Sequence, residues 1–188
     1  DKYGNSIKSN TVTLSMGNSI TDFEWTRLED GTMEVKKYIG TKANVVIPGK
    51  VIGKDVVSIA DSAFGHNDTI TSVRIPDSVT SIGSYVFSTC TELTKVEIPD
   101  TVTSIGRGAF LRCSKLSDVQ LPASLKEAGS GIFESCTSLT EMAIPAGMTY
   151  VPEALFNVCK SLKHVTIPES VVTIERGAFS QCESLTRK

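Results

Sequence analysis

Several features that would indicate a membrane or nucleic-acid protein are missing from the 188-residue chain. Its apolar runs extend over only a few residues, so no segment predicts a membrane span or a signal-peptide core. Lys and Arg number 19 against 21 Asp and Glu, and this near-balance gives no electrostatic case for binding a polyanion. We therefore expect no nucleic-acid partner and no direct insertion into a membrane.

Catalytic motifs are also missing. His66 and His164 lie far apart in the sequence, and neither has a Ser or Cys at a spacing typical of a catalytic pair. The segment Gly129-Ser130-Gly131 does not match a nucleophile elbow, and Gly53-Lys54 lacks the upstream glycine of a phosphate loop. We therefore expect no enzyme activity, no catalytic residues and no cofactor.

What the chain does contain is a strict internal repeat. Proline recurs every 23 residues from Pro76 to Pro168. The sequences between these prolines are nearly identical, as in Ile75-Pro-Asp-Ser-Val-Thr-Ser-Ile-Gly and Ile98-Pro-Asp-Thr-Val-Thr-Ser-Ile-Gly. Six units are visible. The first begins at Ile47 with five extra residues, and the last is incomplete. A fixed period of this length is typical of a solenoid built from stacked units. Phenylalanine follows the same period at Phe64, Phe87, Phe110, Phe133, Phe156 and Phe179.

Each unit carries the pattern of a short strand followed by an inward-pointing aromatic residue. In Leu93-Thr-Lys-Val-Glu-Ile98 apolar and polar residues alternate, as in a half-buried strand, and Pro99 would end its hydrogen-bonding ladder. A second extended piece is expected at residues 102–105, and a single helical turn at residues 108–113 that directs Phe110 inward. Because one unit cannot bury its strand and its Phe alone, the units must stack into a continuous core.

The pattern Ile-Pro-x-Ser-Val-x-x-Ile-Gly-x-x-Ala-Phe-x-x-Cys-x-x-Leu closely resembles the BspA-like, or Treponema-type, leucine-rich repeats of bacterial surface proteins. It runs through residues 45–188. The resemblance implies a leucine-rich-repeat solenoid of β/α type, a right-handed superhelix of six 23-residue-type units with stacked parallel strands. Departures are local: Gly147 replaces Ser or Thr, and Pro152 and Glu175 replace Gly, so we expect slightly bent later units.

The five cysteines share the repeat register and do not cluster. A metal site requires groups such as Cys-x-x-Cys, and a catalytic cysteine would be singular with a basic partner. A residue that recurs in every unit indicates a small side chain that every unit buries. We expect free structural thiols and no metal site, with disulfides between neighbouring units as the less favoured alternative. Together with the Phe residues they form the predicted core ladder: Cys90, Cys113, Cys136, Cys159 and Cys182.

The two ends of the chain differ from the repeats. Residues 21–44 alternate around Asp30-Gly31, which predicts a hairpin that caps the first unit, with Phe23, Trp25 and Tyr38 as its apolar cover. Residues 1–16 resemble the end of a bacterial immunoglobulin-like domain, so residues 1–20 are interpreted as a remnant or linker of a preceding domain.

The chain is interpreted as a piece of a longer protein, because nothing polar closes the stack after Leu185. The open C-terminal end would carry further repeats or associate with another molecule.

The outward side chains of the expected strands form the candidate ligand face. They are mixed in sign and contain no aromatic residue, which favours a protein partner over a polyanion. Lys95 beside Asp118 and Glu141 beside His164 are expected to pair across units. The candidate face comprises Arg74, Lys95, Glu97, Asp118, Gln120, Glu141 and His164.

The resemblance implies a non-catalytic recognition or adhesion module at the bacterial cell surface or outside the cell. Such a module would bind a protein or glycan partner through the repeat face. Two alternatives remain open: a structural spacer in a multidomain surface protein, and an accessory module of a secreted hydrolase. The fold by itself does not decide among them.

Overall fold

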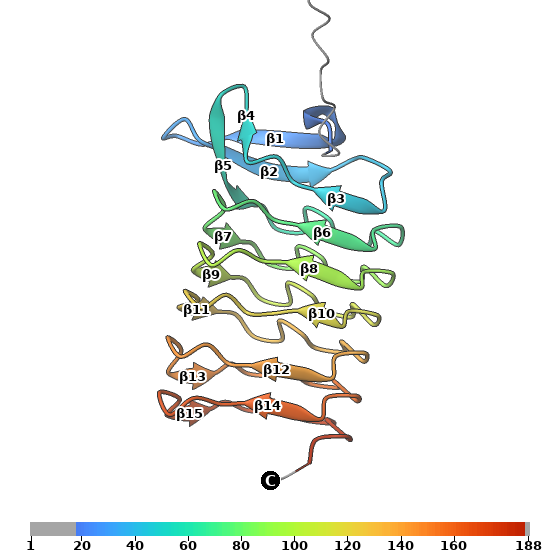
Figure 1. Cartoon of the computed structure of the whole chain (residues 1–188), viewed down its shortest axis with the longest axis vertical. Helices are drawn as coiled ribbons and strands as arrows, with labels where there is room; N and C mark the ends of the chain where they lie inside the picture. The colour runs from blue at the N-terminus through green and yellow to red at the C-terminus, as the bar shows by residue number, and fades with distance from the viewer. Residues whose placement is uncertain (1–17, 187–188) are drawn as a thin grey trace, which may run out of the picture.

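The structure is a computed structural model that describes residues 18–186. The described chain begins with a short 3-10 helix, η1 (Ile20–Asp22), which Ser19 and Asp22 close as a capping box. Fifteen short strands follow and form a solenoid of six turns with stacked parallel strands (Figure 1). The resemblance of residues 1–16 to an immunoglobulin-like domain lies outside the described residues.

An antiparallel hairpin covers the first turn of the solenoid, as the sequence predicts. Its strands are β1 (Phe23–Arg27) and β2 (Met33–Tyr38), and β2 pairs in parallel with β5 (Lys54–Ile59). Gly31, with φ of 82°, takes the left-handed conformation that the turn requires. Two aromatic residues of the hairpin, Phe23 and Tyr38, are buried, and the Tyr38 ring stacks on Phe64 with centroids 5.4 Å apart.

Two rows of strands run along the solenoid and occupy two of the three sides of each coil. The strand face is the row of strands of two or three residues in which an inward apolar residue is flanked by outward residues that are mostly polar. Its members are β3 (Asn44–Val46), β6 (Ser72–Arg74), β8 (Lys95–Glu97), β10 (Asp118–Val119), β12 (Glu141–Ala143) and β14 (His164–Thr166). The second row consists of β5, β7 (Ser81–Ile82), β9 (Ser104–Ile105), β11 (Glu127–Ala128), β13 (Tyr150–Val151) and β15 (Thr173–Ile174). The extra residues of the first unit form β4 (Lys50–Val51), which pairs with β5 in an antiparallel hairpin.

The third side of each coil is a pair of tight turns. The prediction of a helical turn at residues 108–113 is therefore wrong. Gly108 and Arg112 have φ values of 57° and 60°, so the segment cannot continue as a right-handed helix. Apart from η1, no helix occurs in residues 18–186, and the β/α description therefore contributes little to this β-solenoid. The turn side consists of residues 62–66, 85–89, 108–112, 131–135, 154–158 and 177–181.

Backbone hydrogen bonds between units run forward on the turn side, whereas the strand rows contain bonds that run backward as well as forward. On the turn side the N–H of Phe110 donates forward to the carbonyl of Ile132 in the next unit, at 2.9 Å. Beside the strands the N–H of Thr94 donates backward to the carbonyl of Thr71 in the preceding unit, at 2.8 Å. Each unit is therefore joined to both neighbours by two ladders of opposite polarity.

The core is a column of phenylalanine rings, one from each unit. Phe87, Phe110 and Phe133 are fully buried and nearly parallel, with successive centroids 5.3 Å apart. Burial of one such side chain contributes about 1.5–3 kcal/mol, and each ring pair adds about 0.5–1.5 kcal/mol. The column continues to Phe179 in the last unit, where the ring is only half-buried.

Both rows of parallel strands are interrupted at one place, which we call the seam. β10 does not pair with β12, and β11 does not pair with β13, whereas the pairs before and after are regular. The wider spacing between β10 and β12 is visible in Figure 1. The turn side stays continuous across the seam, because the N–H of Phe133 still donates to the carbonyl of Leu155 at 3.0 Å.

Gly147 is one of two sequence departures at the seam. In the unit before it, the hydroxyl of Ser124 donates to the carbonyl of Val102 at 2.7 Å, and so ties its turn to the preceding unit. Gly147 occupies the same slot and has no hydroxyl, although a Cβ there would lie 3.5 Å from the Leu125 carbonyl oxygen. The seam therefore lacks a side-chain bond that the neighbouring units possess.

Pro152 is the other departure. In the equivalent slot Gly129 donates its N–H to the preceding unit at 2.9 Å, but proline has no N–H. The hydroxyl of Tyr150 takes over this role and donates to the carbonyl of Ala128 at 3.3 Å. Glu175, the third departure, keeps its N–H bond at 2.9 Å, so it leaves the ladder intact.

Candidate functional site

The strand face places the predicted ligand residues in successive rungs of one surface. Arg74, Glu97 and Asp118 are exposed, and Lys95 is half-buried on β8 between them. The residue that alternates with them on β8, Val96, is buried in the core. Strand register therefore fixes which side chains reach solvent, as period-two alternation requires.

These four residues form a continuous chain of ion pairs. The Nζ atom of Lys95 lies 3.1 Å from Asp118 Oδ2 and 3.3 Å from Glu97 Oε1, and Arg74 Nε lies 3.6 Å from Glu97 Oε2. The hydrogen bond to Asp118, followed by the one to Glu97, raises the pKa of Lys95. The expected pairing of Lys95 with Asp118 across units is therefore present. Because the pairs are exposed, they define the pattern of charge more than they stabilise the fold.

The other three predicted residues lie beyond the ion-paired row, around the seam. Glu141 and His164 are partners in the register of β12 and β14, but no ion pair joins them in the described chain. Gln120 lies on the opposite side of the seam. All three line a hollow of about 180 Å³ whose floor includes Met142. The structure thus groups the candidate face into two parts, one charged and ordered by ion pairs, the other a shallow hollow.

The cysteine column lies inside the solenoid and has the properties of structural thiols. Each Sγ–H donates to a phenylalanine carbonyl of the preceding unit, as Cys113 does to Phe87 at 3.0 Å. All five cysteines are free; four are buried and Cys182 is half-buried. Burial raises the pKa of Cys90 to about 11 and that of Cys159 to about 12. Such thiols are almost entirely protonated at neutral pH and are poor nucleophiles.

In the first unit, Asn67 takes the place of the cysteine. Its Oδ1 atom accepts hydrogen bonds from the backbone N–H groups of Thr69 and Ile70, both at 3.0 Å. The residue is half-buried, whereas the cysteines of the four following units are fully buried. Asn67 therefore closes its turn through its own backbone contacts.

Residues 18–186 contain no cluster of three or more His, Cys, Asp or Glu side chains that could hold a metal ion. Over the same residues, no helix has the length and apolar character needed to cross a bilayer.

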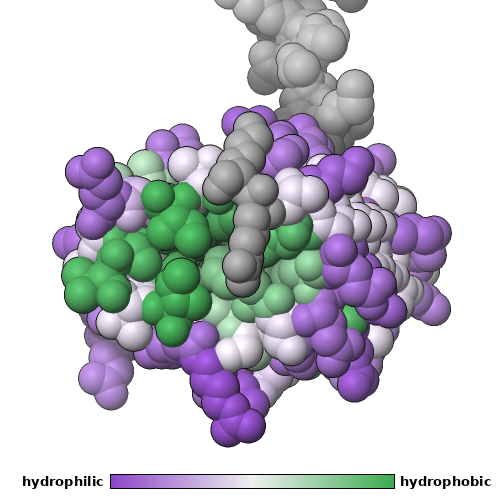
Figure 2. Space-filling model, turned by 90° about the horizontal axis from the view of Figure 1, so that it is seen from below, coloured by the Kyte–Doolittle hydropathy of each residue, from purple (hydrophilic) through white to green (hydrophobic). Residues whose placement is uncertain are grey.

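The C-terminal end of the described solenoid presents an apolar surface (Figure 2). Ile167 and Ile174 are 40% and 53% exposed, whereas their counterparts one unit earlier, Ile144 and Val151, are buried by the unit that follows. Val172 is 85% exposed for a different reason, because it stands in an outward slot that the exposed residues Lys126 and Thr149 occupy in the two preceding units. Association through this end stays a prediction.

A second hollow lies on the turn side, and the sequence analysis missed it. Aligning the units would have found its signal, because Tyr85 stands in the slot that Gly108, Gly131 and Gly177 occupy in three other units. Strand alternation gives no information about this side, which contains only turns.

Comparison with known proteins now identifies the chain's relatives. The family model described as "BspA type Leucine rich repeat region" matches residues 57–186 in six copies. The chain belongs to this family. No curated protein matches it.

Three solved structures of leucine-rich repeat proteins are similar over most of this chain. The leucine-rich repeat protein of T. pallidum is 29% identical with a TM-score of 0.74, over 90% of this chain and 91% of the other. A leucine-rich cell surface protein from Faecalibacterium prausnitzii is 32% identical with a TM-score of 0.82, over 92% and 54%. A leucine-rich repeat protein from Bacteroides ovatus is 34% identical with a TM-score of 0.81, over 89% and 45%. The chain thus spans nearly the whole length of the first structure and about half of the other two.

Proposed function

We propose that this BspA-type repeat protein is a non-catalytic recognition or adhesion module that binds a protein partner through its strand face. The observation that carries the proposal is the ion-paired row of Arg74, Glu97, Lys95 and Asp118. It presents charges of both signs in a fixed order on a stacked backbone. Such a row provides electrostatic complementarity to a protein surface and little attraction for a polyanion.

A location at the bacterial cell surface or outside the cell is part of the same proposal. Its support is the similarity to the Faecalibacterium prausnitzii structure, which is described as a leucine-rich cell surface protein. Repeat solenoids commonly bind through extended surfaces of this kind, because successive units repeat the same outward positions.

The test is to screen the chain against an array of extracellular-matrix proteins and to measure any hit by titration. We expect a saturable hit that weakens at least tenfold in the variants Lys95→Glu and Asp118→Lys, because each places like charges beside one another. The matched control is Lys126→Glu, which reverses an exposed charge beside the other strand row. Absence of binding at tens of micromolar, or equal weakening by the control, would contradict the proposal.

The structural spacer is the second candidate. It is favoured by the fact that the charges of the row neutralise one another within the molecule. A folded protein with no hit in the array would support it. The accessory role beside a hydrolase stays a prediction, which activity assays on a longer chain would address.

A further inference from the structure

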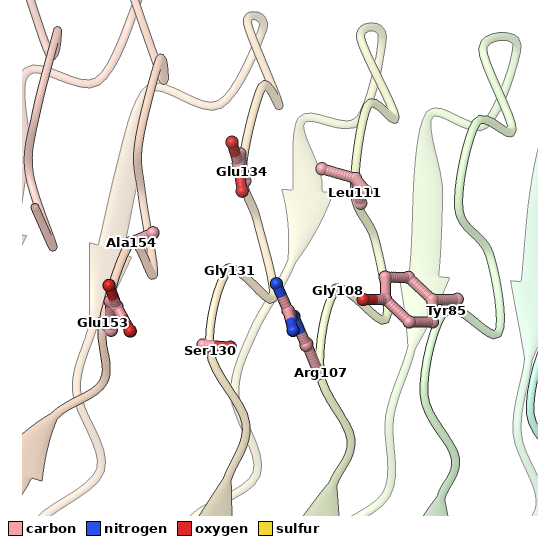
Figure 3. A pocket seen from close by; sticks show the side chains of 9 residues that line it. All are labelled: Tyr85, Arg107, Gly108, Leu111, Ser130, Gly131, Glu134, Glu153 and Ala154. Carbon is pink, nitrogen blue, oxygen red and sulfur yellow. The ribbon is translucent and has the colours of Figure 1, made fainter.

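The hollow on the turn side has a volume of about 140 Å³, and four successive units contribute to it (Figure 3). Its central column is formed by Tyr85, Gly108, Gly131 and Ala154, which occupy the same slot of their units. Because two consecutive glycines carry no side chain, the column is open between Tyr85 at one end and Ala154 at the other. The opening arises from two glycine residues and one tyrosine ring.

Tyr85 and Gly108 are matched to each other. A Cβ atom at Gly108 would lie only 2.7 Å from Cε1 of the Tyr85 ring, closer than real Cβ contacts come. The ring therefore lies over Gly108 and forms a half-buried aromatic wall at one end of the hollow. Any larger residue at position 108 would displace it.

Tyr85 occupies a backbone conformation that disfavours a tyrosine. Its φ is 56°, in the left-handed region, and three of the other five units have glycine in this slot. The Tyr85 hydroxyl has no hydrogen-bond partner in residues 18–186. The left-handed conformation itself belongs to the turn, because Ser62 and Ala154 adopt it in the same slot with φ of 58° and 54°. What distinguishes this unit is the aromatic side chain, whose hydroxyl remains available to a ligand.

Unpartnered polar groups flank the hollow on the side next to the second strand row. The Arg107 guanidinium forms no ion pair within the described chain, and neither does the Glu153 carboxylate. The floor itself offers no free donors, because the N–H of Gly108 donates to Ser130 O at 2.9 Å and that of Gly131 to Glu153 O at 2.8 Å. Recognition in this hollow therefore depends on side chains.

The other flank mixes polar and apolar character. Glu134 accepts a hydrogen bond from Asn157 Nδ2 at 3.0 Å, which fixes one carboxylate oxygen. Leu111 lies beside it in the same flank. One guanidinium and two carboxylates give this rim charges of both signs and disfavour an anion. Together with the aromatic ring, these donors and acceptors fit a neutral molecule with many hydroxyl groups.

We propose that this hollow binds a single pyranose unit of a neutral saccharide. The apolar C–H face of the sugar packs on the Tyr85 ring, and its hydroxyl groups donate to the Glu153 carboxylate and accept from Arg107. The site lies on the turn side, so it is independent of the protein partner proposed for the strand face.

The experiment is a titration followed by amide NMR, with methyl glycosides of glucose, galactose, mannose and N-acetylglucosamine as the probes. We expect one or more of them to shift the amide signals of Gly108 and Gly131 saturably. The dissociation constant should be about 1–10 mM, because a shallow single-sugar site buries few atoms. No saturable shift with any of the four would overturn the proposal, as would shifts confined to the strand face.

Two variants and one matched control test the geometry. Tyr85→Ser removes the ring and installs the residue that the first unit carries at Ser62, with φ of 58°. Gly131→Ala places a methyl group in the hollow, at a slot where Ala154 is already accommodated. Gly177→Ala makes the same change in the same slot outside the hollow, where the nearest atom is 3.9 Å away. We expect at least tenfold weaker binding in the first two variants and unchanged binding in the third; equal binding in all of them would overturn the proposal.

Discussion

The junction between β8 and β10 and the seam between β10 and β12 are built from the same repeat but held differently. At the first, Lys95 and Val96 pair with Asp118 and Val119, and the phenylalanine column and the turn ladder continue alongside. At the seam the strand pairing is missing, whereas the column, the turn ladder and side-chain bonds such as that of Tyr150 to the Ala128 carbonyl continue. The ring centroids of Phe133 and Phe156 are 5.8 Å apart instead of 5.3 Å. The strand rows are thus dispensable at one junction, whereas the turn side and the column are continuous.

The difference follows from two substitutions that remove hydrogen-bonding groups. Gly147 lacks the hydroxyl, and Pro152 lacks the N–H, that the equivalent residues use to bond to the preceding unit. A nearest-neighbour solenoid tolerates such losses, because its stability is close to a sum of terms for units and interfaces. The seam is therefore expected to be the weakest interface between consecutive units in the interior of the described stack.

The largest expected effect is loss of a ring from the column, which both kinds of junction share. Phe110→Ala should lower the free energy of unfolding by about 3–5 kcal/mol, because the ring is fully buried between two others. Phe179→Ala should cost clearly less, since that ring is half-buried and has a ring partner on one side only. Urea denaturation of both variants measures the difference. Equal losses would show that the last unit is packed as tightly as the interior.

The thiol column also crosses both kinds of junction, and alkaline pH tests it. Well below pH 9 the thiols are protonated in both the folded and the unfolded state. Above pH 9 the unfolded chain loses thiol protons that the folded chain keeps, so stability should fall as pH rises towards the folded pKa of Cys90, about 11. Cys90 alone should account for about 2–3 kcal/mol at the upper end of this range. The difference in pH dependence between the wild type and Cys90→Ala isolates this contribution, and identical slopes would contradict it.

Restoring the missing hydroxyl should strengthen the seam directly. Gly147→Ser would place its Oγ near the Leu125 carbonyl and raise the free energy of unfolding by about 0.5–1.5 kcal/mol. The reverse change at a regular junction, Ser124→Gly, should lower it by about the same amount, because it removes the 2.7 Å bond to Val102. Thermal unfolding of the two variants measures both changes in the free energy of unfolding. If Gly147→Ser destabilises the protein, the seam is not caused by the missing group.

The smallest effect concerns local opening and is visible only by hydrogen exchange. The Thr103 amide donates to the carbonyl of Thr80 at 2.9 Å, whereas the equivalent amide of Thr149, at the seam, has no bond to the preceding unit. We expect the Thr149 amide to exchange at least tenfold faster at neutral pH. Similar protection of the two amides would indicate that the strand rows close across the seam in solution.

Much of this architecture is predictable from the sequence, because each structural position of the unit occurs several times and shows which residue types it accepts. The period predicts the stacked strands and the outward position of Lys95 and Asp118, and the Asp30-Gly31 turn predicts the hairpin cap. Conversely, the predicted helical turn at residues 108–113 failed. Its composition fits a helix, but Arg112 takes a left-handed conformation because the N–H groups of the segment bond to the next unit.

The candidate sites were less accessible from the sequence. The sequence identifies Gly147 and Pro152 as departures from the repeat. Their effect depends on which carbonyl the equivalent residue of another unit bonds, and that carbonyl lies in the preceding unit. The turn-side hollow depends on the Tyr85 ring lying over Gly108, a contact between units that composition does not reveal. The pairing of Glu141 with His164 also failed, because partners in strand register need not direct their side chains at one another.

The opposite polarity of the two hydrogen-bond ladders has an electrostatic consequence for the whole rod. In an α-helix all peptide dipoles point the same way and leave about half a charge at each end. Here the N–H of Phe110 points forward along the axis and that of Thr94 points backward, so the axial components of the two ladders oppose each other. As units are added, the dipole of the turn ladder is therefore offset by that of the backward bonds beside the strands, and it does not accumulate as it does in an α-helix.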